Sequence, residues 1–190
     1  MKYVASFFLI INLAICILSG CANAQNSSAE KKESLVDKES LTDENILIVY
    51  LSRTKNTKAI AEIIHENVGG TLVELELENP YPENYREIVD QVADENATGF
   101  LPPLKTKIDS IEKYEVIFIG FPTWGMRLPP PMKSFLNQYN LSGKTVIPFN
   151  TNAGYGIGSS FETVKQLCPD SKILEGSSIK GGIERDGFFL

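Results

Sequence analysis

The chain has 190 residues, of which 43% are hydrophobic and 22% are charged. This length suffices for one well-packed domain and is too short for two of ordinary size. The formal net charge of the whole chain is -6. Lys2 is the only charged residue among residues 1–20, so the rest of the chain has 17 basic and 24 acidic side chains and a net charge of -7. An acidic surface repels nucleic acid phosphates and favours basic protein partners, although solubility alone also explains it.

Residues 1–20 have the pattern of a secretory signal. Lys2 precedes a long apolar run over residues 4–18, and small residues then lead to Cys21. The sequence LSGC at residues 18–21 resembles the bacterial lipobox, in which cleavage before the cysteine leaves it as the acylated N-terminus. We therefore expect a lipid on Cys21 that anchors the protein to a membrane of the bacterial cell envelope. An uncleaved transmembrane anchor is the alternative, and both arrangements place the domain outside the cytoplasm.

A polar segment, residues 21–45, separates this signal from the first apolar strand. It is rich in Ser, Asn, Glu and Lys, so it cannot bury enough surface to fold alone. We expect a flexible tether with a root-mean-square reach of roughly 25–30 Å, followed by a folded domain over residues 46–190. Cys168 is the one cysteine of that domain, which excludes a disulfide within it, and its place before Pro169 at a helix end indicates packing.

Strands and helices are expected to alternate along the domain. Unbroken apolar runs and period-two alternation predict strands at residues 46–51, 71–77, 116–120, 146–149 and 172–179. Helical spacing and a proline-rich start predict helices at residues 59–68, 84–96, 129–139 and 159–167. In the second strand apolar residues alternate with glutamates, so we expect this strand near the sheet edge, with one face exposed to solvent. The alternation predicts an α/β fold with a doubly wound, five-stranded parallel sheet.

The loop after the first strand, residues 52–57 (SRTKNT), leads into the N-terminus of a helix. A helix start favours an anion by about 0.3–1 kcal/mol through its dipole and its backbone N–H groups. Three hydroxyls in six residues exceed what an ordinary N-cap needs, although such a cap is the alternative explanation. We therefore predict a phosphate site made of Ser52, Arg53, Thr54, Lys55, Asn56 and Thr57.

Two more loops follow the carboxyl ends of apolar strands, where open α/β sheets bind ligands. The first holds the single tryptophan, on which a flat aromatic ligand can stack, while a core tryptophan is the alternative. The second offers amides and one aromatic ring, and taken alone it is a weak signal. The candidate binding residues in these loops are Pro122, Thr123, Trp124, Gly125, Met126, Asn150, Thr151, Asn152, Gly154, Tyr155 and Gly156.

Together these loops resemble those of the flavodoxin family, over nearly all of residues 46–180. Ser52, Thr54, Asn56 and Thr57 match the family's Ser/Thr-x-Thr-Gly-x-Thr phosphate loop, and residues 124–125 match its Trp-Gly pair. The resemblance implies the strand order 2-1-3-4-5 and non-covalent binding of FMN, with its phosphate on the first loop.

The same resemblance implies roles around the flavin ring. Trp124 stacks on one face, and Tyr155 covers the other. The Gly125 carbonyl turns toward flavin N5 and stabilises the neutral semiquinone, while the amides of Gly154 and Gly156 reach the pyrimidine edge.

The sequence also departs from the family pattern. Lys55 stands where glycine is usual, which costs backbone freedom and adds a cation beside the phosphate. Met126 replaces a frequent acidic residue, and residues 150–156 contain no acid, so we expect the hydroquinone to be less disfavoured than in strongly acidic flavodoxins. The family's C-terminal helix has no counterpart before the chain ends at Leu190. Either the chain is truncated or one sheet face is partly bare, which would favour a partner or a homodimer.

A lipid-tethered FMN electron carrier is the function that this resemblance implies, with redox proteins as partners. We find no catalytic triad, paired acid and base, or metal-ligand spacing in the sequence. Two alternatives stay open: an FMN-dependent NAD(P)H:quinone reductase of similar fold, and a binding module without flavin.

Overall fold

The computed structural model describes residues 43–181. All of these residues belong to a single compact unit of the chain. The expected signal segment, the lipid-bearing Cys21 and the tether before residue 43 lie outside the described residues, as does the C-terminal segment 182–190. Within residues 43–181, no helix combines the length and apolar character needed to span a membrane.

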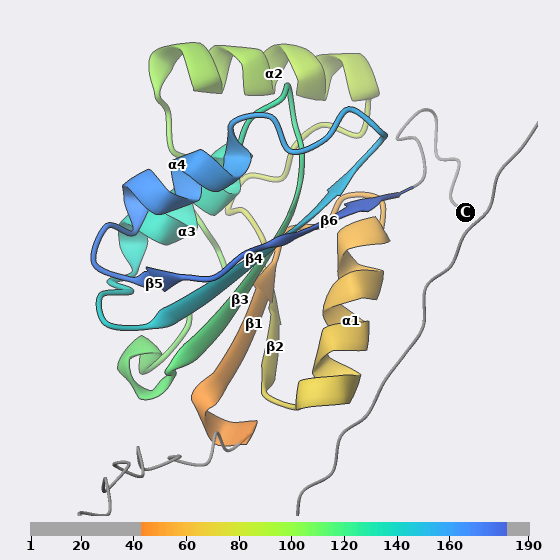
Figure 1. The fold of residues 1–190 in the computed structure, drawn as a ribbon. Coiled ribbons are helices and arrows are strands. Elements are labelled where there is room, and N and C mark those ends of the chain that lie inside the picture. The colour runs from red at the N-terminus through yellow and green to blue at the C-terminus, as the bar shows by residue number, and fades with distance from the viewer. Residues whose placement is uncertain (1–42, 182–190) are drawn as a thin grey trace, which may run out of the picture. The chain divides into compact units, whose positions relative to one another are not determined.

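A parallel sheet lies at the centre of the domain (Figure 1). Its strands are β1 (Ile46–Tyr50), β2 (Thr71–Glu74), β3 (Val116–Pro122), β4 (Thr145–Asn152), β5 (Lys172–Ile173) and β6 (Ser177–Lys180). The strand order is β2-β1-β3-β4-β5, with β6 also paired to β4, and every pairing is parallel. The predicted α/β fold and strand order are therefore confirmed, and β2 lies at the edge as expected.

Within residues 43–181, four α-helices and two short 3-10 helices surround the sheet. They are η1 (Asp43–Asn45), α1 (Asn56–Val68), α2 (Tyr85–Thr98), η2 (Ile111–Lys113), α3 (Pro130–Gln138) and α4 (Ser160–Leu167). Local sequence sets their ends: the Asn84 side chain accepts hydrogen bonds from the backbone N–H groups of Arg86 and Glu87, and Gly99 ends α2 at a φ of 74°. Proline opens α3, where a missing N–H costs nothing.

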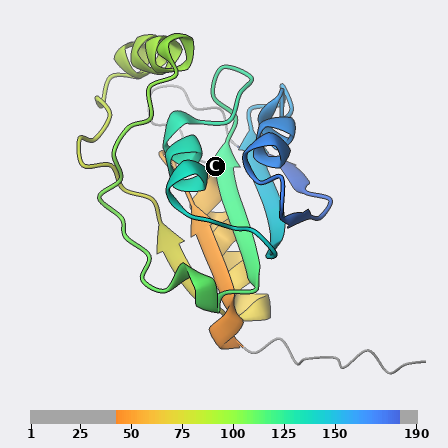
Figure 2. The same ribbon diagram turned by 90° about the vertical axis from the view of Figure 1, so that its left-hand side faces the viewer.

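Helices cover both faces of the sheet. Alternate residues of β1 point to opposite faces, so Leu47 and Val49 pack with the core beside α3 and α4, while Ile46 and Ile48 pack beside α1. Figure 2 looks onto the face that α3 and α4 cover, with α1 behind the sheet. Burying one such side chain stabilises the fold by about 1.5–3 kcal/mol.

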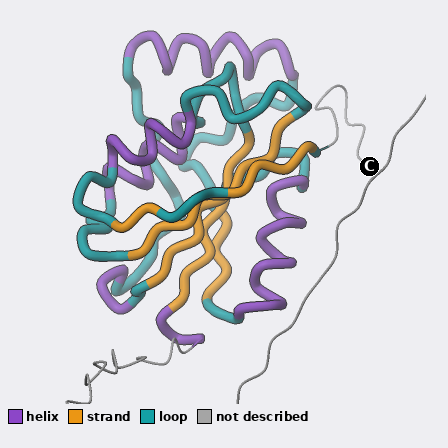
Figure 3. The backbone as a smooth tube through the Cα atoms, in the orientation of Figure 1, coloured by secondary structure: helices purple, strands orange, loops and turns teal. Residues whose placement is uncertain are grey.

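The predicted fifth strand is interrupted, which corrects the expectation of one strand over 172–179 (Figure 3). Residues 147–148 of β4 lie opposite three residues, 174–176, between the paired segments. Pro148 has no backbone N–H to donate, so the ladder cannot continue there. A side chain at Gly176 would come within 2.6 Å of the Pro148 carbonyl oxygen. A bulge with glycine at its close approach therefore divides the strand into β5 and β6.

The sheet face beside α1 is covered incompletely. Val116, Phe118 and Ile147 are half-buried there, whereas Ile117 and Ile119 on the opposite face are fully buried. The helix that the family places beside α1 would fall on residues outside the described part, so its predicted absence stays a prediction.

Candidate functional site

The carboxyl ends of β1, β3 and β4 open into a cavity of about 910 Å³. Its volume lies in the upper part of the range for small-molecule and cofactor sites. Residues from all three predicted loops line it: Arg53, Thr54, Asn56, Pro122, Thr123, Trp124, Gly125, Met126, Thr151, Asn152 and Tyr155. The loops picked out from the sequence therefore meet at one place.

The phosphate loop presents Arg53, Thr54 and Asn56 to this cavity. Asn56 begins α1, and its side-chain Nδ2 donates a hydrogen bond to Thr54 Oγ1 at 3.3 Å. The backbone N–H groups in the first turn of a helix have no partner within the helix, which makes this end suitable for an anion.

Lys55 adopts a left-handed backbone conformation, with a φ of 66°. This conformation costs a residue with a side chain about 1–2 kcal/mol, which is a physical reason for glycine at this position of the family pattern. The side chain of Lys55 is exposed and does not line the cavity. The cation that the phosphate loop contributes to the cavity is that of Arg53.

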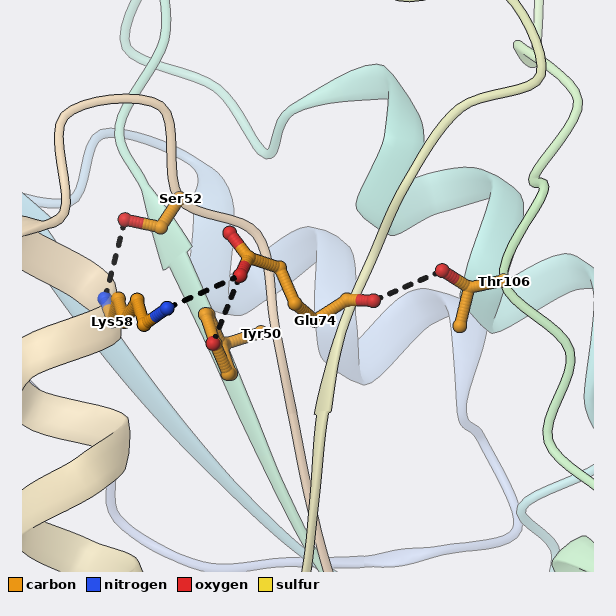
Figure 4. A network of polar contacts seen from close by, with 5 residues as sticks. All are labelled: Tyr50, Ser52, Lys58, Glu74 and Thr106. Atoms are coloured by element: carbon orange, nitrogen blue, oxygen red, sulfur yellow. Dashed lines mark hydrogen bonds and ion pairs between the residues drawn. The ribbon is translucent and has the colours of Figure 1, made fainter.

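A polar network holds the phosphate loop against the sheet (Figure 4). Ser52 Oγ accepts a hydrogen bond from the backbone N–H of Lys58 at 3.2 Å, and Lys58 Nζ lies 3.8 Å from Glu74 Oε2. Tyr50 donates to the same carboxylate oxygen at 3.1 Å, while Thr106 Oγ1 donates to the Glu74 backbone carbonyl at 2.9 Å. Burial, and then the Glu74 carboxylate, raise the pKa of Tyr50. Ser52 therefore anchors the loop and does not line the cavity.

Three buried polar residues, Thr57, Asn150 and Thr151, join the three loops to one another. The hydroxyls of Thr57 and Thr151 share a hydrogen bond of 2.8 Å. Asn150 Nδ2 donates to the Phe121 carbonyl at 3.1 Å and to Thr123 Oγ1 at 2.8 Å. Thr57 and Asn150, both predicted as binding residues, thus position the loops from behind the cavity wall.

The glycine amides of the third loop bond to a side chain of that loop. Asn152 Oδ1 accepts hydrogen bonds from Gly154 N at 2.8 Å and from Gly156 N at 3.1 Å. Neither glycine lines the cavity. In this structure the two amides that were expected at the pyrimidine edge shape the loop, while Tyr155 between them is exposed and borders the cavity.

The second loop is a tight turn with two residues at positive φ. Trp124 and Arg127 exchange backbone hydrogen bonds of 3.3 and 3.0 Å, and φ is 55° at Gly125 and 59° at Met126. Positive φ at both central residues is the mark of a type I′ turn. The Met126 carbonyl accepts a hydrogen bond from Ser159 N at 3.0 Å, so the start of α4 supports the turn.

Trp124 is half-buried in the cavity wall, and a second aromatic ring supports it from behind. The Tyr81 ring meets it edge-on, with centroids 5.5 Å apart and an interplanar angle of 79°. Tyr81 donates a 2.5 Å hydrogen bond to Glu95 Oε2, and Gln91 donates one to Glu95 Oε1 at 2.8 Å. Glu95 is only 4% exposed, and burial together with this carboxylate raises the pKa of Tyr81. This supporting group was not identified from the sequence.

Helix α2 forms a further wall that was likewise not identified from the sequence. It lies beyond the carboxyl edge of the sheet in both ribbon views (Figures 1 and 2). Its contribution to the lining is mostly apolar or small: Tyr85, Ile88, Val89, Val92, Ala93, Asn96 and Ala97. Arg127, Ala153 and Gly181 complete the lining. The sequence signal for this wall was the apolar side formed by Ile88, Val89 and Val92, but packing of the helix against the core explains such a side equally well.

Two further kinds of site, a metal site and a reactive cysteine, can be compared with the described part of the chain. Residues 43–181 contain no group of His, Cys, Asp and Glu side chains that could hold a metal ion. Cys168 is a buried free cysteine within the core, and burial raises its pKa to about 11. This environment fits the packing role expected for it.

Residues 45–188 match the family model described as Flavodoxin. The chain belongs to the flavodoxin family. No curated protein matches it significantly.

Solved structures agree with this family assignment. A protein assigned as a flavoprotein from Bacteroides eggerthii DSM 20697 is 33% identical, with a TM-score of 0.65 over 71% of this chain and 87% of that one. Another from Bacteroides uniformis ATCC 8492 is 26% identical, with a TM-score of 0.67 over 74% and 92%. A flavoprotein in complex with FMN from Lactobacillus acidophilus NCFM is 22% identical, with a TM-score of 0.65 over 71% and 93%, a likeness that shows the fold alone.

Proposed function

We propose that this flavodoxin-family domain binds FMN non-covalently and carries electrons between redox partners. The observation that carries the proposal is one cavity that joins the N-terminus of α1 to the ring of Trp124. The Lactobacillus acidophilus protein of the same fold was crystallised with FMN. FMN supplies one- and two-electron chemistry when bound, and the protein supplies binding and electrostatic tuning.

The lining chemistry suits the two ends of FMN. Arg53, Thr54 and Asn56 would hold the phosphate at the start of α1, where the helix dipole also favours negative charge. Trp124 offers a flat apolar surface for the ring system, and Tyr155 is available from the third loop.

The charges around the cavity favour a relatively stable, fully reduced flavin. Among the described residues, its lining contains Arg53 and Arg127 but no aspartate or glutamate. A cation lowers the energy of a nearby anion, whereas a carboxylate raises it. We therefore expect the second reduction potential to be less negative than in flavodoxins with acidic residues beside the flavin.

Redox titration of the FMN-loaded protein tests this expectation, and rapid mixing with NADPH tests the carrier role. A carrier is reduced slowly by NADPH and quickly by a redox protein, whereas a reductase is reduced quickly by NADPH. A very low second potential would contradict the electrostatic argument, and fast reduction by NADPH would favour the reductase.

We further propose that lipid on Cys21 tethers the domain outside the cytoplasm, within reach of redox proteins with basic docking surfaces. The support is the signal pattern of residues 1–21 and the acidic net charge. Replacing Cys21 with alanine should abolish incorporation of labelled fatty acid and release the protein from membranes. Fatty-acid labelling of Cys21→Ala at the level of the unchanged protein would refute this tether.

A further inference from the structure

The cavity extends beyond the three loops that are expected to hold FMN. Residues Tyr85, Val89, Ala93 and Ala97 follow one another at intervals of four along α2, so they form one stripe on its surface. All four line the cavity, yet all are exposed, with 45% of Val89 accessible. An exposed apolar stripe inside a cavity is a surface that a ligand can bury.

Contacts at both ends hold α2 across the cavity. At its N-terminal end, Arg53 Nη2 donates a 2.9 Å hydrogen bond to the Glu83 carbonyl, and its guanidinium lies 6.0 Å from the centre of the Tyr85 ring. Near its C-terminal end, Lys133 Nζ from α3 donates to Asn96 Oδ1 at 2.7 Å. These contacts tie α2 to the phosphate loop at one end and to α3 at the other.

The chemistry of the α2 stripe favours one kind of occupant. Exposed carboxylates surround the outer side of the helix at Glu83, Glu87, Asp90 and Asp94. The charged groups of residues 43–181 that line the cavity are the guanidiniums of Arg53 and Arg127, whereas the α2 stripe itself carries no charge. The stripe is apolar, small or aromatic, so it favours contact with a flat, uncharged and weakly polar molecule over contact with a charged group.

We propose that the stripe of α2 and the Trp124–Met126 turn enclose a second compartment beside the flavin, which binds a planar quinone. The inference rests on the proposed binding of FMN and names a small-molecule electron acceptor for that site. Two electrons and two protons would pass from the reduced flavin to the quinone, which becomes a hydroquinone while the flavin returns to its oxidised form. A low-potential redox protein is the reductant that restores the reduced flavin.

Calorimetric titration of the FMN-loaded full chain with 2-methyl-1,4-naphthoquinone tests the compartment without turnover. Val89→Glu places a carboxylate in the apolar wall, and Ala93→Leu fills space without adding charge. Gln166→Glu adds the same charge on the exposed surface of α4, outside the cavity, and serves as the matched control. We expect both cavity variants to weaken quinone binding at least tenfold and by a larger factor than they weaken FMN binding, while the control leaves both affinities unchanged.

Each contrary outcome has a distinct meaning. If FMN itself does not bind, the proposed function fails before quinone is tested. If FMN binds but the loaded protein takes up no quinone, or takes up NADPH in its place, the second compartment is refuted and FMN binding stands. If Val89→Glu and Ala93→Leu weaken FMN as much as quinone, α2 is a cover for the flavin, and the inference is overturned.

Discussion

Removing the Thr54 hydroxyl should separate the phosphate end of the site from its ring end. Thr54 lines the cavity and is half-buried, and its Oγ1 accepts a hydrogen bond from Asn56, which leaves its own proton to donate elsewhere. A hydrogen bond to a charged group contributes about 1.5–3 kcal/mol. Thr54→Ala should therefore weaken FMN binding by about 10- to 150-fold. Riboflavin lacks the phosphate, so its affinity should change little.

Quenching of flavin fluorescence measures both affinities on the same protein. Thr163→Ala is a suitable control, because this α4 threonine also carries a hydroxyl that bonds within the chain but does not line the cavity. Equal losses for FMN and riboflavin would refute the assignment of the phosphate to the first loop. An unchanged melting temperature would show that the loss is one of binding and not of folding.

Three further predictions concern backbone strain, ring stacking and pH. Lys55→Gly should raise the free energy of unfolding, measured in denaturant titrations, by about 0.5–1 kcal/mol. The reason is that glycine relieves the strain of the left-handed backbone in the folded state by more than it stabilises the unfolded chain through added entropy. A variant less stable than the original protein would contradict this. Trp124→Ala should lower FMN affinity by about threefold or more through lost stacking and should shift the potentials; unchanged values of both would exclude Trp124 from the site. The pKa of Tyr50 and that of Tyr81 are raised in the fold. The free energy of unfolding should therefore stay constant with respect to these tyrosines below pH 10 and fall above it, by up to about 1.4 kcal/mol per pH unit for each tyrosine. This fall should be less steep in Tyr81→Phe, and an equally steep fall in the variant and the original protein would refute the raised pKa of Tyr81.

The sequence predicted those features that are governed by local pattern. Buried strands are unbroken apolar runs, and the parallel order follows from their alternation with helices and from the family resemblance. The three strand-end loops converge because parallel strands end at the same edge of the sheet. Family membership also supports the expectation of FMN.

Features that depend on tertiary contacts could not be predicted. The interruption between β5 and β6 depends on the approach of Gly176 to Pro148, two residues far apart in the sequence. The sequence likewise gives no sign that Asn152 bonds the amides of Gly154 and Gly156.

The α2 wall was missed for a similar reason. Helical periodicity identifies Ile88, Val89 and Val92 as one apolar side but does not reveal that this side borders a cavity. The support of Trp124 by Tyr81 and Glu95 joins residues that no sequence motif connects.

Titration of the purified, flavin-free chain with FMN, followed by visible absorbance and by the fluorescence of its single tryptophan, tests the central claim most directly. We predict saturable binding of one FMN per chain, a shift of the flavin bands and quenching of Trp124. Bands that stay those of free FMN, with unquenched tryptophan emission at saturating concentrations, would contradict the claim that this cavity holds a flavin.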